Sequence, residues 1–245
     1  PDDVSFTSGG TEANNLAVFG VIEALHAAGR AYADMEVITT ELEHPSLLKA
    51  IESLAERGVA VHTVPVTEEG CIATQQFRER INERTVLVAT AYVNSEIGVI
   101  QPLRKLKRIL HKADSAALLL VDGAQAPLWL SCQLETIGAD ILTLDGGKMY
   151  GPKGSGLIAT RHGVALAPYL LGGGQERGVR PGTENQASIV GLATALEIAQ
   201  ANYERRREGV AKLRDHFIER VLELNNVVLN GPSPRAALGL EARVA

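Results

Sequence analysis

The sequence predicts an α/β protein with a mainly parallel β-sheet that is covered by helices on both faces. Short apolar runs alternate with amphipathic segments along most of the 245 residues, and this alternation is typical of consecutive β-α units. The runs are almost continuously apolar, as expected of strands that are buried on both faces. The chain is 45% hydrophobic and 22% charged, which is enough apolar content for one sizeable core.

The first elements form a predicted α-β-α-β series. Residues 11–29 carry Ala, Leu, Val and Ile at helical spacing, and Gly29 ends this helix. A strand is expected over 35–40. The segment 45–58 begins on Pro and stops on Gly, the usual asymmetry of a helix, and 59–66 then alternates as a strand.

The alternation continues towards the C-terminus. From about Thr183 to Leu224 the sequence predicts a long helix that bends near Gly209. Ligands of such sheets bind beyond the carboxyl ends of the strands, so residues just after strands are the candidates for a functional site. Before the long helix, the sequence predicts a strand, a helix and three further strands over 85–93, 102–113, 116–122, 139–145 and 155–160.

The composition excludes several classes of protein. A net charge of -5 argues against a nucleic-acid or membrane partner, because a phosphate-rich surface selects a basic face. No apolar run approaches the roughly 20 residues of a spanning helix, and no charged leader opens the chain. With only Cys71 and Cys132, a disulfide framework is not expected, which favours a cytoplasmic protein. Because the chain opens on Pro1 without an initiator Met, we expect a fragment.

Two glycine-rich stretches are candidate anion sites. In "TSGGTEANN" the glycine pair ending at Gly10 permits a sharp turn and Thr11 opens a helix, so backbone N–H groups and a hydroxyl would face an anion. The same features also fit an ordinary helix start. In "GGGQERGVRPGTEN" two arginines lead to Thr183 at a helix N-cap position, which suits a carboxylate or phosphate but also a mobile connection with solvent-facing arginines.

A carboxylate ends one of the predicted strands. Burying the Asp122 carboxylate at this position costs free energy unless a cation or a hydrogen-bond donor contacts it. Gln125 lies one turn away. No second Asp, Glu or His lies at ligand spacing, so we expect no metal. A protonated heterocyclic nitrogen would satisfy a single carboxylate well.

A lysine and a histidine follow two other strands. A lysine that is desolvated beside cationic groups becomes a nucleophile, and Lys148 has glycine neighbours that leave room for a bulky partner. A surface lysine is the alternative, and Lys153 is the rival candidate. His44 is either an ordinary satisfied polar residue or a flat imidazole that stacks on a cofactor and exchanges protons near neutral pH.

The polar motifs occur in the order "TSGGTEANN" (7–15), "EHPS" (43–46), "VNSEIGVIQP" (93–102), "VDGAQ" (121–125), "GGKMYGPKGSG" (146–156) and "GGGQERGVRPGTEN" (172–185). This ordered set resembles the pyridoxal-phosphate-dependent cysteine desulfurases of the class V aminotransferase group, over roughly residues 4–232. The resemblance implies an aspartate-aminotransferase-like (fold type I) large domain over 1–205, incomplete at its N-terminus. Residues 206–245 would be a connecting helix and the start of a truncated small domain.

The resemblance also implies roles around a pyridoxal 5'-phosphate cofactor. Lys148 would carry the cofactor covalently, and His44 would stack on its ring, which makes both residues catalytic candidates. Asp122 would pair with the pyridinium nitrogen, and Gln125 would hydrogen-bond the ring oxygen.

At the phosphate end, the resemblance gives Gly10 and Thr11 the role of holding the phosphate. Thr183 would reach the phosphate of a partner subunit, so a homodimer is implied.

Three positions depart from the family pattern. Ser95 stands where the family has an Asn that contacts the cofactor, so the side chain available for this contact is shorter. Asp145 stands where the family commonly has a phosphate-binding Ser, and Gly147 replaces a His. We expect the Asp145 carboxylate to turn away from the phosphate, because Gly146 and Gly147 free the backbone. Protonation, or neutralisation by a nearby Lys or Arg, are the alternatives.

The implied reaction takes sulfur from L-cysteine, leaving L-alanine and an enzyme persulfide for iron-sulfur cluster assembly or tRNA thiolation through a sulfur-acceptor protein. The sulfur-accepting cysteine of the family lies in a C-terminal region that this chain does not contain, and neither Cys71 nor Cys132 matches it. We therefore expect the chain alone to be inactive. A selenocysteine lyase, a small-amino-acid aminotransferase and a non-catalytic scaffold are the alternatives, and a buried Lys148 amine facing a buried Asp122 carboxylate argues against the scaffold.

Overall fold

The computed structural model describes residues 3–233, which fold around one seven-stranded sheet. The strands are β1 (Val4–Thr7), β2 (Glu36–Thr39), β3 (Ala60–Thr63), β4 (Thr85–Ala91), β5 (Leu118–Asp122), β6 (Ile141–Asp145) and β7 (Gly156–Thr160). Their order in the sheet is β1-β7-β6-β5-β4-β2-β3. All neighbours from β3 to β6 pair in parallel, whereas β7 runs antiparallel to both β6 and β1. The predicted mainly parallel sheet is confirmed.

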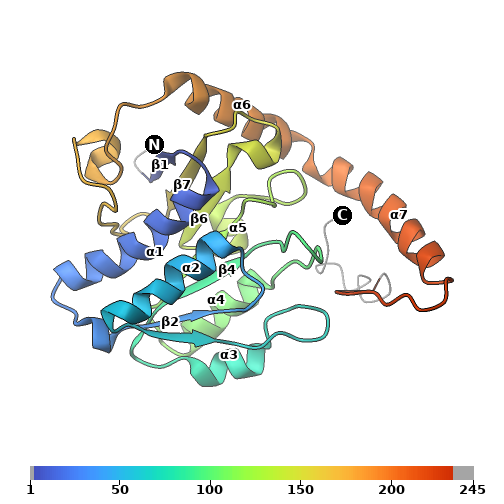
Figure 1. Ribbon diagram of the computed structural model, residues 1–245, viewed down its shortest axis with the longest axis horizontal. Helices are drawn as coiled ribbons and strands as arrows, with labels where there is room; N and C mark the ends of the chain where they lie inside the picture. Colours follow the sequence, from blue (N-terminus) through green and yellow to red (C-terminus); the bar gives the residue numbers. More distant parts are fainter. Residues whose placement is uncertain (1–2, 234–245) are drawn as a thin grey trace.

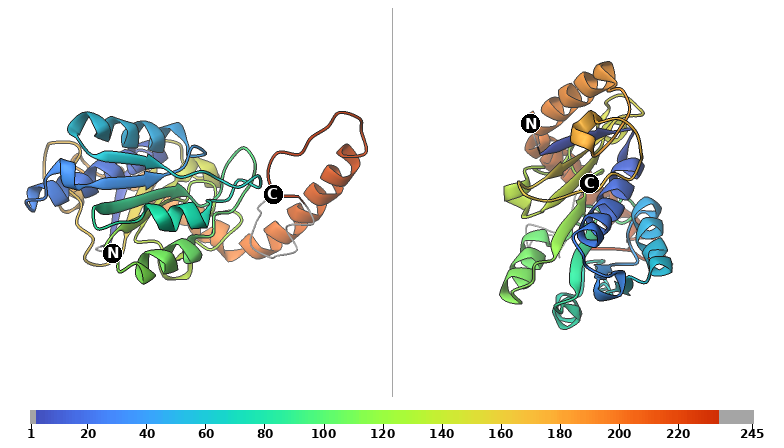
Figure 2. Two further views of the ribbon diagram at one scale, coloured as in Figure 1. Left: turned by 90° about the horizontal axis from the view of Figure 1, so that it is seen from below. Right: turned by 90° about the vertical axis from the view of Figure 1, so that its left-hand side faces the viewer.

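Helices follow most of the strands and cover both faces of the sheet (Figures 1 and 2). The α-helices of the described residues are α1 (Gly10–Ala27), α2 (Pro45–Ser53), α3 (Thr74–Arg80), α4 (Leu103–Lys112), α5 (Leu134–Ile137), α6 (Gln186–Ala201) and α7 (Tyr203–Val221). Short 3-10 helices are η1 (Tyr32–Asp34), η2 (Leu54–Arg57), η3 (Gly146–Met149) and η4 (Gln175–Gly178). Of the strands and α-helices, the sequence patterns did not predict β1 or α5, both of which are short, and they gave no bounds for the helix after Cys71, which is α3.

Alternate residues of each strand contribute to two separate apolar layers. Helices α1 and α2 pack on one face, together with Leu87 of β4 and Leu120 of β5. Helices α4 and α6 pack on the other face, together with Val88 and Leu119 of the same strands. Because successive side chains of a strand point to opposite faces, a strand covered on both sides is apolar throughout. This arrangement explains the continuous apolar runs in the sequence.

The C-terminal helical region consists of two helices rather than one bent helix. The predicted bend at Gly209 is wrong, because the chain leaves the helical conformation at Asn202 (φ −134°, ψ 14°) while Gly209 lies within α7. Asn competes with the helix for backbone hydrogen bonds, which favours such a break. The predicted N-cap position of Thr183 is also wrong, because Asn185 caps α6.

Helix α7 extends away from the sheet (Figures 1 and 2). The predicted domain boundary between residues 205 and 206 falls inside this helix and stays a prediction. The end of the predicted second domain, residues 234–245, lies outside the described residues. Within the described part of the chain, no helix combines the length and the apolar character needed to cross a membrane.

Candidate active site

A pocket of about 530 Å³ lies at the carboxyl ends of β2, β4, β5 and β6, next to the N-terminus of α1. This is the edge of the sheet where the sequence predicts a ligand site. All predicted site residues except Thr183 line it, namely Gly10, Thr11, His44, Ser95, Asp122, Gln125 and Lys148. Thr183 is exposed on the loop before α6, and its predicted role in a partner's site stays a prediction.

The N-terminus of α1 comes close to this edge because two glycines allow it. Gly9, the N-cap, has φ 143° and ψ 177°, a conformation that L side chains rarely adopt. Gly156 of β7 passes directly beside it, and a Cβ at this position would lie 2.6 Å from the carbonyl carbon of Gly9. The turn that begins α1 is therefore packed tightly on β7.

We expect Gly156→Ala to lower the free energy of unfolding by about 1–3 kcal/mol or more, because the backbone of Gly9 cannot yield to the added methyl group. Chemical denaturation measures this loss. Gly209→Ala is the matched control, since no described atom lies within 4 Å of its added methyl group, and it should stabilise α7 by up to about 1 kcal/mol. Equal effects of the two changes would contradict the tight packing.

Asp122 is held by two hydrogen-bond donors. Its Oδ2 accepts from Asn14 Nδ2 (2.8 Å), and its Oδ1 accepts from the backbone N–H of Ala124 (3.0 Å). Asn14 is oriented in turn by the hydroxyl of Thr143, which donates to Asn14 Oδ1 (2.6 Å). Asp122, Asn14 and Thr143 are all buried, so the carboxylate is fixed in position and its desolvation is offset by these donors.

The sequence patterns did not single out Asn14 or Thr143 as site residues. A usable signal existed for Asn14, which is a polar residue on the apolar face of a predicted helix, but such a residue acquires a role only once its partner across the fold is known. Thr143 lies in the interior of an apolar strand, where a hydroxyl has no distinguishing pattern.

His44 is the N-cap of α2 and is exposed at the pocket. Its Nδ1 accepts a hydrogen bond from the backbone N–H of Ser46 (3.1 Å) and lies 2.7 Å from the Ser46 hydroxyl. An accepting Nδ1 assigns the proton of the neutral ring to Nε2. The Ser46 hydroxyl also accepts from Asn14 (2.9 Å), so the histidine and the Asp122 carboxylate share one hydrogen-bond network.

Glu43 is a further buried carboxyl group at this pocket, and the sequence patterns did not single it out. It accepts hydrogen bonds from the Thr40 hydroxyl (2.6 Å), the Thr90 hydroxyl (3.0 Å) and the backbone N–H of Ala91. Burial raises the pKa of Glu43 to about 7, because these hydrogen bonds offset only part of the desolvation and the Asp122 charge adds to the rise. Glu43 thereby joins the turn that carries His44 to the end of β4.

The raised pKa makes stability depend on pH. Between pH 4.5, the ordinary value, and about pH 7, folded Glu43 holds a proton that the unfolded chain has released, so its contribution to stability falls as the pH rises through this range. The difference in unfolding free energy between Glu43→Gln and the parent should therefore change with pH. It should shift in favour of Glu43→Gln by up to about 3 kcal/mol as the pH rises from about 5 to about 8. Denaturant titrations across this range measure the gain, with exposed Glu41→Gln as control. Parallel pH profiles for Glu43→Gln and the parent would refute it.

Lys148 lies in η3, directly after β6, and lines the pocket. Its side chain is exposed, so the expectation of a buried amine is wrong for this chain. Among the described residues, no hydrogen bond or ion pair engages its Nζ, and the amine is available to a ligand. Lys153, the rival candidate, is exposed and does not belong to the described residues that line the pocket.

Asp145, at the end of β6, points towards the α1 N-terminus. Its Oδ2 accepts a hydrogen bond from the backbone N–H of Gly10 (3.0 Å), and its Oδ1 accepts from that of Gly147 (2.8 Å). The prediction that this carboxylate turns away from the anion position is therefore wrong. The glycines free the backbone, as expected, but this freedom does not direct the carboxylate into solvent. The N–H groups at the start of a helix have no partner within the helix and attract the carboxylate instead.

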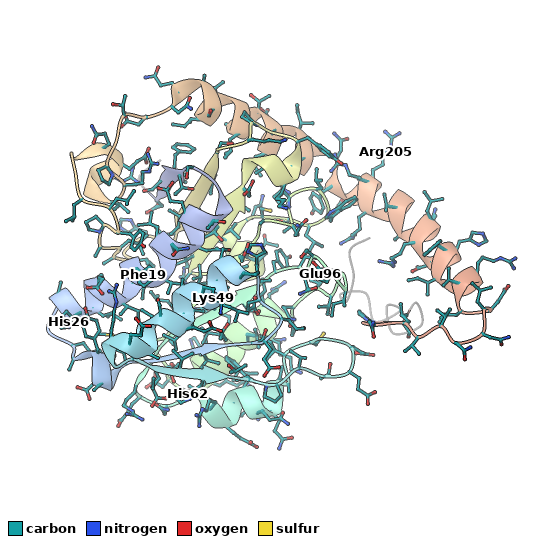
Figure 3. The ribbon with its side chains drawn as sticks, viewed as in Figure 1. Phe19, His26, Lys49, His62, Glu96 and Arg205 are labelled. Carbon is teal, nitrogen blue, oxygen red and sulfur yellow. The ribbon has the colours of Figure 1, made fainter. Side chains whose placement is uncertain are left out.

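Ser95 and the two arginines of the 172–185 loop have partners within the protein. The Ser95 hydroxyl donates to Glu96 Oε1 (3.3 Å) on the loop after β4, where Figure 3 labels Glu96. In the 172–185 loop, Arg180 pairs with Glu12 of α1 (2.7 Å), and Arg177 donates to the Ser5 hydroxyl (3.1 Å). Both arginines therefore fasten the loop to the domain, although Arg177 is itself exposed to solvent and Arg180 is only partly buried.

An amine, a fixed carboxylate and an imidazole line one pocket at the carboxyl edge of a mainly parallel sheet, which is where α/β domains of this kind typically bind their ligands. The chain belongs to the aminotransferase class-V family, whose model matches residues 1–239.

Relatives that the chain resembles within this family are named cysteine desulfurases. The chain is 38% identical to cysteine desulfurase IscS 1 of Archaeoglobus fulgidus and 34% identical to cysteine desulfurase IscS of Dictyoglomus turgidum. Both alignments cover 94% of this chain, which spans 58% and 57% of these relatives. The resemblance inferred from the motifs is confirmed.

Solved structures show the same similarity. A NifS-like protein superposes with a TM-score of 0.89 at 32% identity, over 100% of this chain and 63% of that protein. DndA from Streptomyces lividans gives 0.84 at 34% identity, over 94% and 64%. SspA, solved in complex with cysteine, gives 0.73 at 34% identity, over 80% and 55%.

Proposed function

We propose that this chain is the cofactor-binding domain of a pyridoxal-phosphate-dependent cysteine desulfurase. The reaction would take sulfur from L-cysteine and leave L-alanine and an enzyme persulfide, for sulfur transfer such as iron-sulfur cluster assembly or tRNA thiolation. The observation that carries the proposal is that Lys148 and the fixed Asp122 carboxylate line one pocket. Similarity to proteins named cysteine desulfurase, and to SspA bound to cysteine, supports the substrate.

The ring end of the pocket fits pyridoxal phosphate. Both oxygens of Asp122 accept hydrogen bonds from protein donors, which orients the carboxylate to meet a protonated ring nitrogen. Gln125 and His44 line the same pocket and would contact the ring. When bound, the cofactor would supply an electron sink for the substrate carbanion.

The protein's own groups would hold and move protons beside the ring. The Lys148 Nζ is a flexible amine that is unpaired within the described part of the chain, which suits a group that alternately binds and releases a proton. The neutral His44 ring carries its proton on Nε2, because Nδ1 accepts from Ser46. That assignment gives His44 a donor to offer to a ligand.

The two cysteines of this chain are not suited to accept sulfur. Neither is among the described residues that line the pocket. Burial raises the pKa of Cys132 to about 12 and also raises that of Cys71, so both stay protonated at neutral pH, whereas the thiolate is the nucleophile. We propose that the accepting cysteine comes from outside this chain.

We further propose a cytoplasmic homodimer that passes sulfur to an acceptor protein. Val190 and Ile198 of α6 and Leu171 of the preceding loop are exposed apolar side chains, which a second copy of the chain would cover. Thr183 lies on the same connection and would then reach the neighbouring pocket.

The substrate assignment is tested by adding L-cysteine to protein loaded with pyridoxal phosphate. L-cysteine should change the visible absorbance of the bound cofactor in a saturable way, and L-alanine should compete with it. Product analysis should show no net turnover by the chain alone. Absence of any L-cysteine effect would contradict the substrate, and conversion of bound pyridoxal phosphate to its amine form would instead support an aminotransferase.

A further inference from the structure

The carboxylate of Asp145 lies between two backbone amides at the N-terminus of α1. Its two oxygens accept from Gly10 N–H (3.0 Å) and Gly147 N–H (2.8 Å). The first N–H groups of a helix have no partner within the helix and lie at the positive end of its dipole, so they attract an anion. A tethered carboxylate therefore fills the position that α1 offers to an anion in this pocket.

The chain is packed to accommodate this carboxylate. A Cβ at Gly10 would lie 3.2 Å from both Cβ and Oδ2 of Asp145, and a Cβ at Gly147 would lie 3.2 Å from Oδ1. Glycine at both positions is therefore what lets the carboxylate approach the two amides. Over residues 3–233, no lysine or arginine forms an ion pair with Asp145, and the hydrogen bonds that its carboxylate accepts come from these two backbone amides.

We propose that Asp145 is a specificity-determining residue that makes this pocket discriminate against the phosphate group of the proposed cofactor. The inference rests on the proposed function, because it concerns the same pocket. A phosphate monoester carries about 1.5 to 2 negative charges at pH 7. At about 4 Å, repulsion between one pair of unit charges weakens binding about fivefold in water and about a thousandfold at an effective dielectric near 20.

A phosphate group would also compete directly for the Gly10 N–H, which Asp145 already occupies. Pyridoxal, the phosphate-free form, keeps the aldehyde for Lys148 and the ring nitrogen for Asp122 but brings no charge towards Asp145. The parent protein should therefore bind pyridoxal at least as tightly as pyridoxal phosphate. A hydroxyl at position 145 should reverse this order.

The test compares both compounds on the purified 245-residue chain. Absorbance titration gives each Kd. Borohydride reduction followed by peptide mapping shows whether the bound compound is attached to Lys148. Asp145→Ser and Asp145→Asn remove the charge while keeping an N-cap side chain for η3. Glu96→Gln is the matched control, because it removes a charge from the same pocket without touching Gly10. Thermal denaturation checks the fold of every variant.

Asp145→Ser should tighten pyridoxal phosphate binding by about tenfold or more and change pyridoxal binding by less than about fivefold. Glu96→Gln should change both affinities by less than about fivefold. An unchanged preference in Asp145→Ser, or equal tightening of both compounds, would overturn the inference while leaving the proposed function standing. Failure of every folded variant to bind either compound at Lys148 would overturn both and favour a non-catalytic scaffold.

Discussion

Lys148→Ala should abolish the reducible attachment of pyridoxal or its phosphate to this protein, whereas Lys153→Ala should leave it intact. Lys148 lines the pocket, and its amine is unpaired among residues 3–233. Asp122, which lines the same pocket, fixes where the ring nitrogen would lie. An aldehyde oriented in this way meets the Lys148 amine at high effective concentration, so labelling should fall by at least about a hundredfold when that amine is removed.

The measurement is borohydride reduction followed by peptide mapping on the parent and both lysine variants. Lys153 lies five residues further along the same glycine-rich segment and is exposed, so it controls for non-specific reaction of surface amines. A reduced adduct on Lys153 in the parent protein, or undiminished labelling of Lys148→Ala, would disprove the assignment of Lys148.

Element positions were predictable wherever the pattern was local and strong. Strand β4 lies within the predicted 85–93 run, because it is buried on both faces and therefore apolar throughout. Strand β1 was missed because its four residues are flanked by polar Asp3 and Ser8, whereas the equally short β2 and β3 lie next to further apolar residues. Its antiparallel pairing with β7 cannot be inferred from so short a run. The break at Asn202 was misassigned to Gly209 because glycine is the commoner helix breaker, whereas an exposed glycine inside α7 costs too little to end it.

The site was predictable as a set of polar residues after strands, but not in its internal contacts. Asp122 and Lys148 were singled out because strand ends in such sheets meet at one edge. The orientation of Asp145 was predicted wrongly because it depends on Gly10, which is 135 residues away in sequence. Asn14 was missed for the same reason, since its partner Asp122 lies 108 residues further on. Contacts of this kind carry no local sequence pattern.

Asp122→Asn should remove most cofactor-dependent chemistry and should also destabilise the fold. Both neighbours of the Asp122 carboxylate, Asn14 Nδ2 and the Ala124 N–H, are donors. An amide at position 122 puts a third donor among them, so one buried donor loses its acceptor at a cost of about 1–3 kcal/mol in unfolding free energy. A loss of function in this variant alone would therefore not separate charge from structure.

The exchanged pair Asn14→Asp with Asp122→Asn separates the two effects. The amide introduced at position 122 would donate to the new carboxylate at position 14 and still accept from Ala124, while that carboxylate would accept from Thr143. The bond between positions 14 and 122 is thereby kept with reversed polarity, and the bonds from Ala124 and Thr143 keep their direction. The Ser46 hydroxyl, which accepts from Asn14 in the parent, would have to donate to the new carboxylate instead. The negative charge moves from the end of β5 into α1. Denaturation should show most of the stability lost in Asp122→Asn restored in the exchanged pair.

Function should not return with stability, because a neutral amide at position 122 cannot stabilise a protonated ring nitrogen. The measurement is exchange of the α-hydrogen of L-alanine with D2O by protein loaded with pyridoxal phosphate, a partial reaction that needs no sulfur acceptor. Both Asp122→Asn and the exchanged pair should be slower than the parent by about 10²- to 10⁴-fold, the usual effect of losing a positioned charged group. Near-parental exchange in the exchanged pair would show that the hydrogen-bond network, rather than the carboxylate of Asp122, is what the chemistry requires.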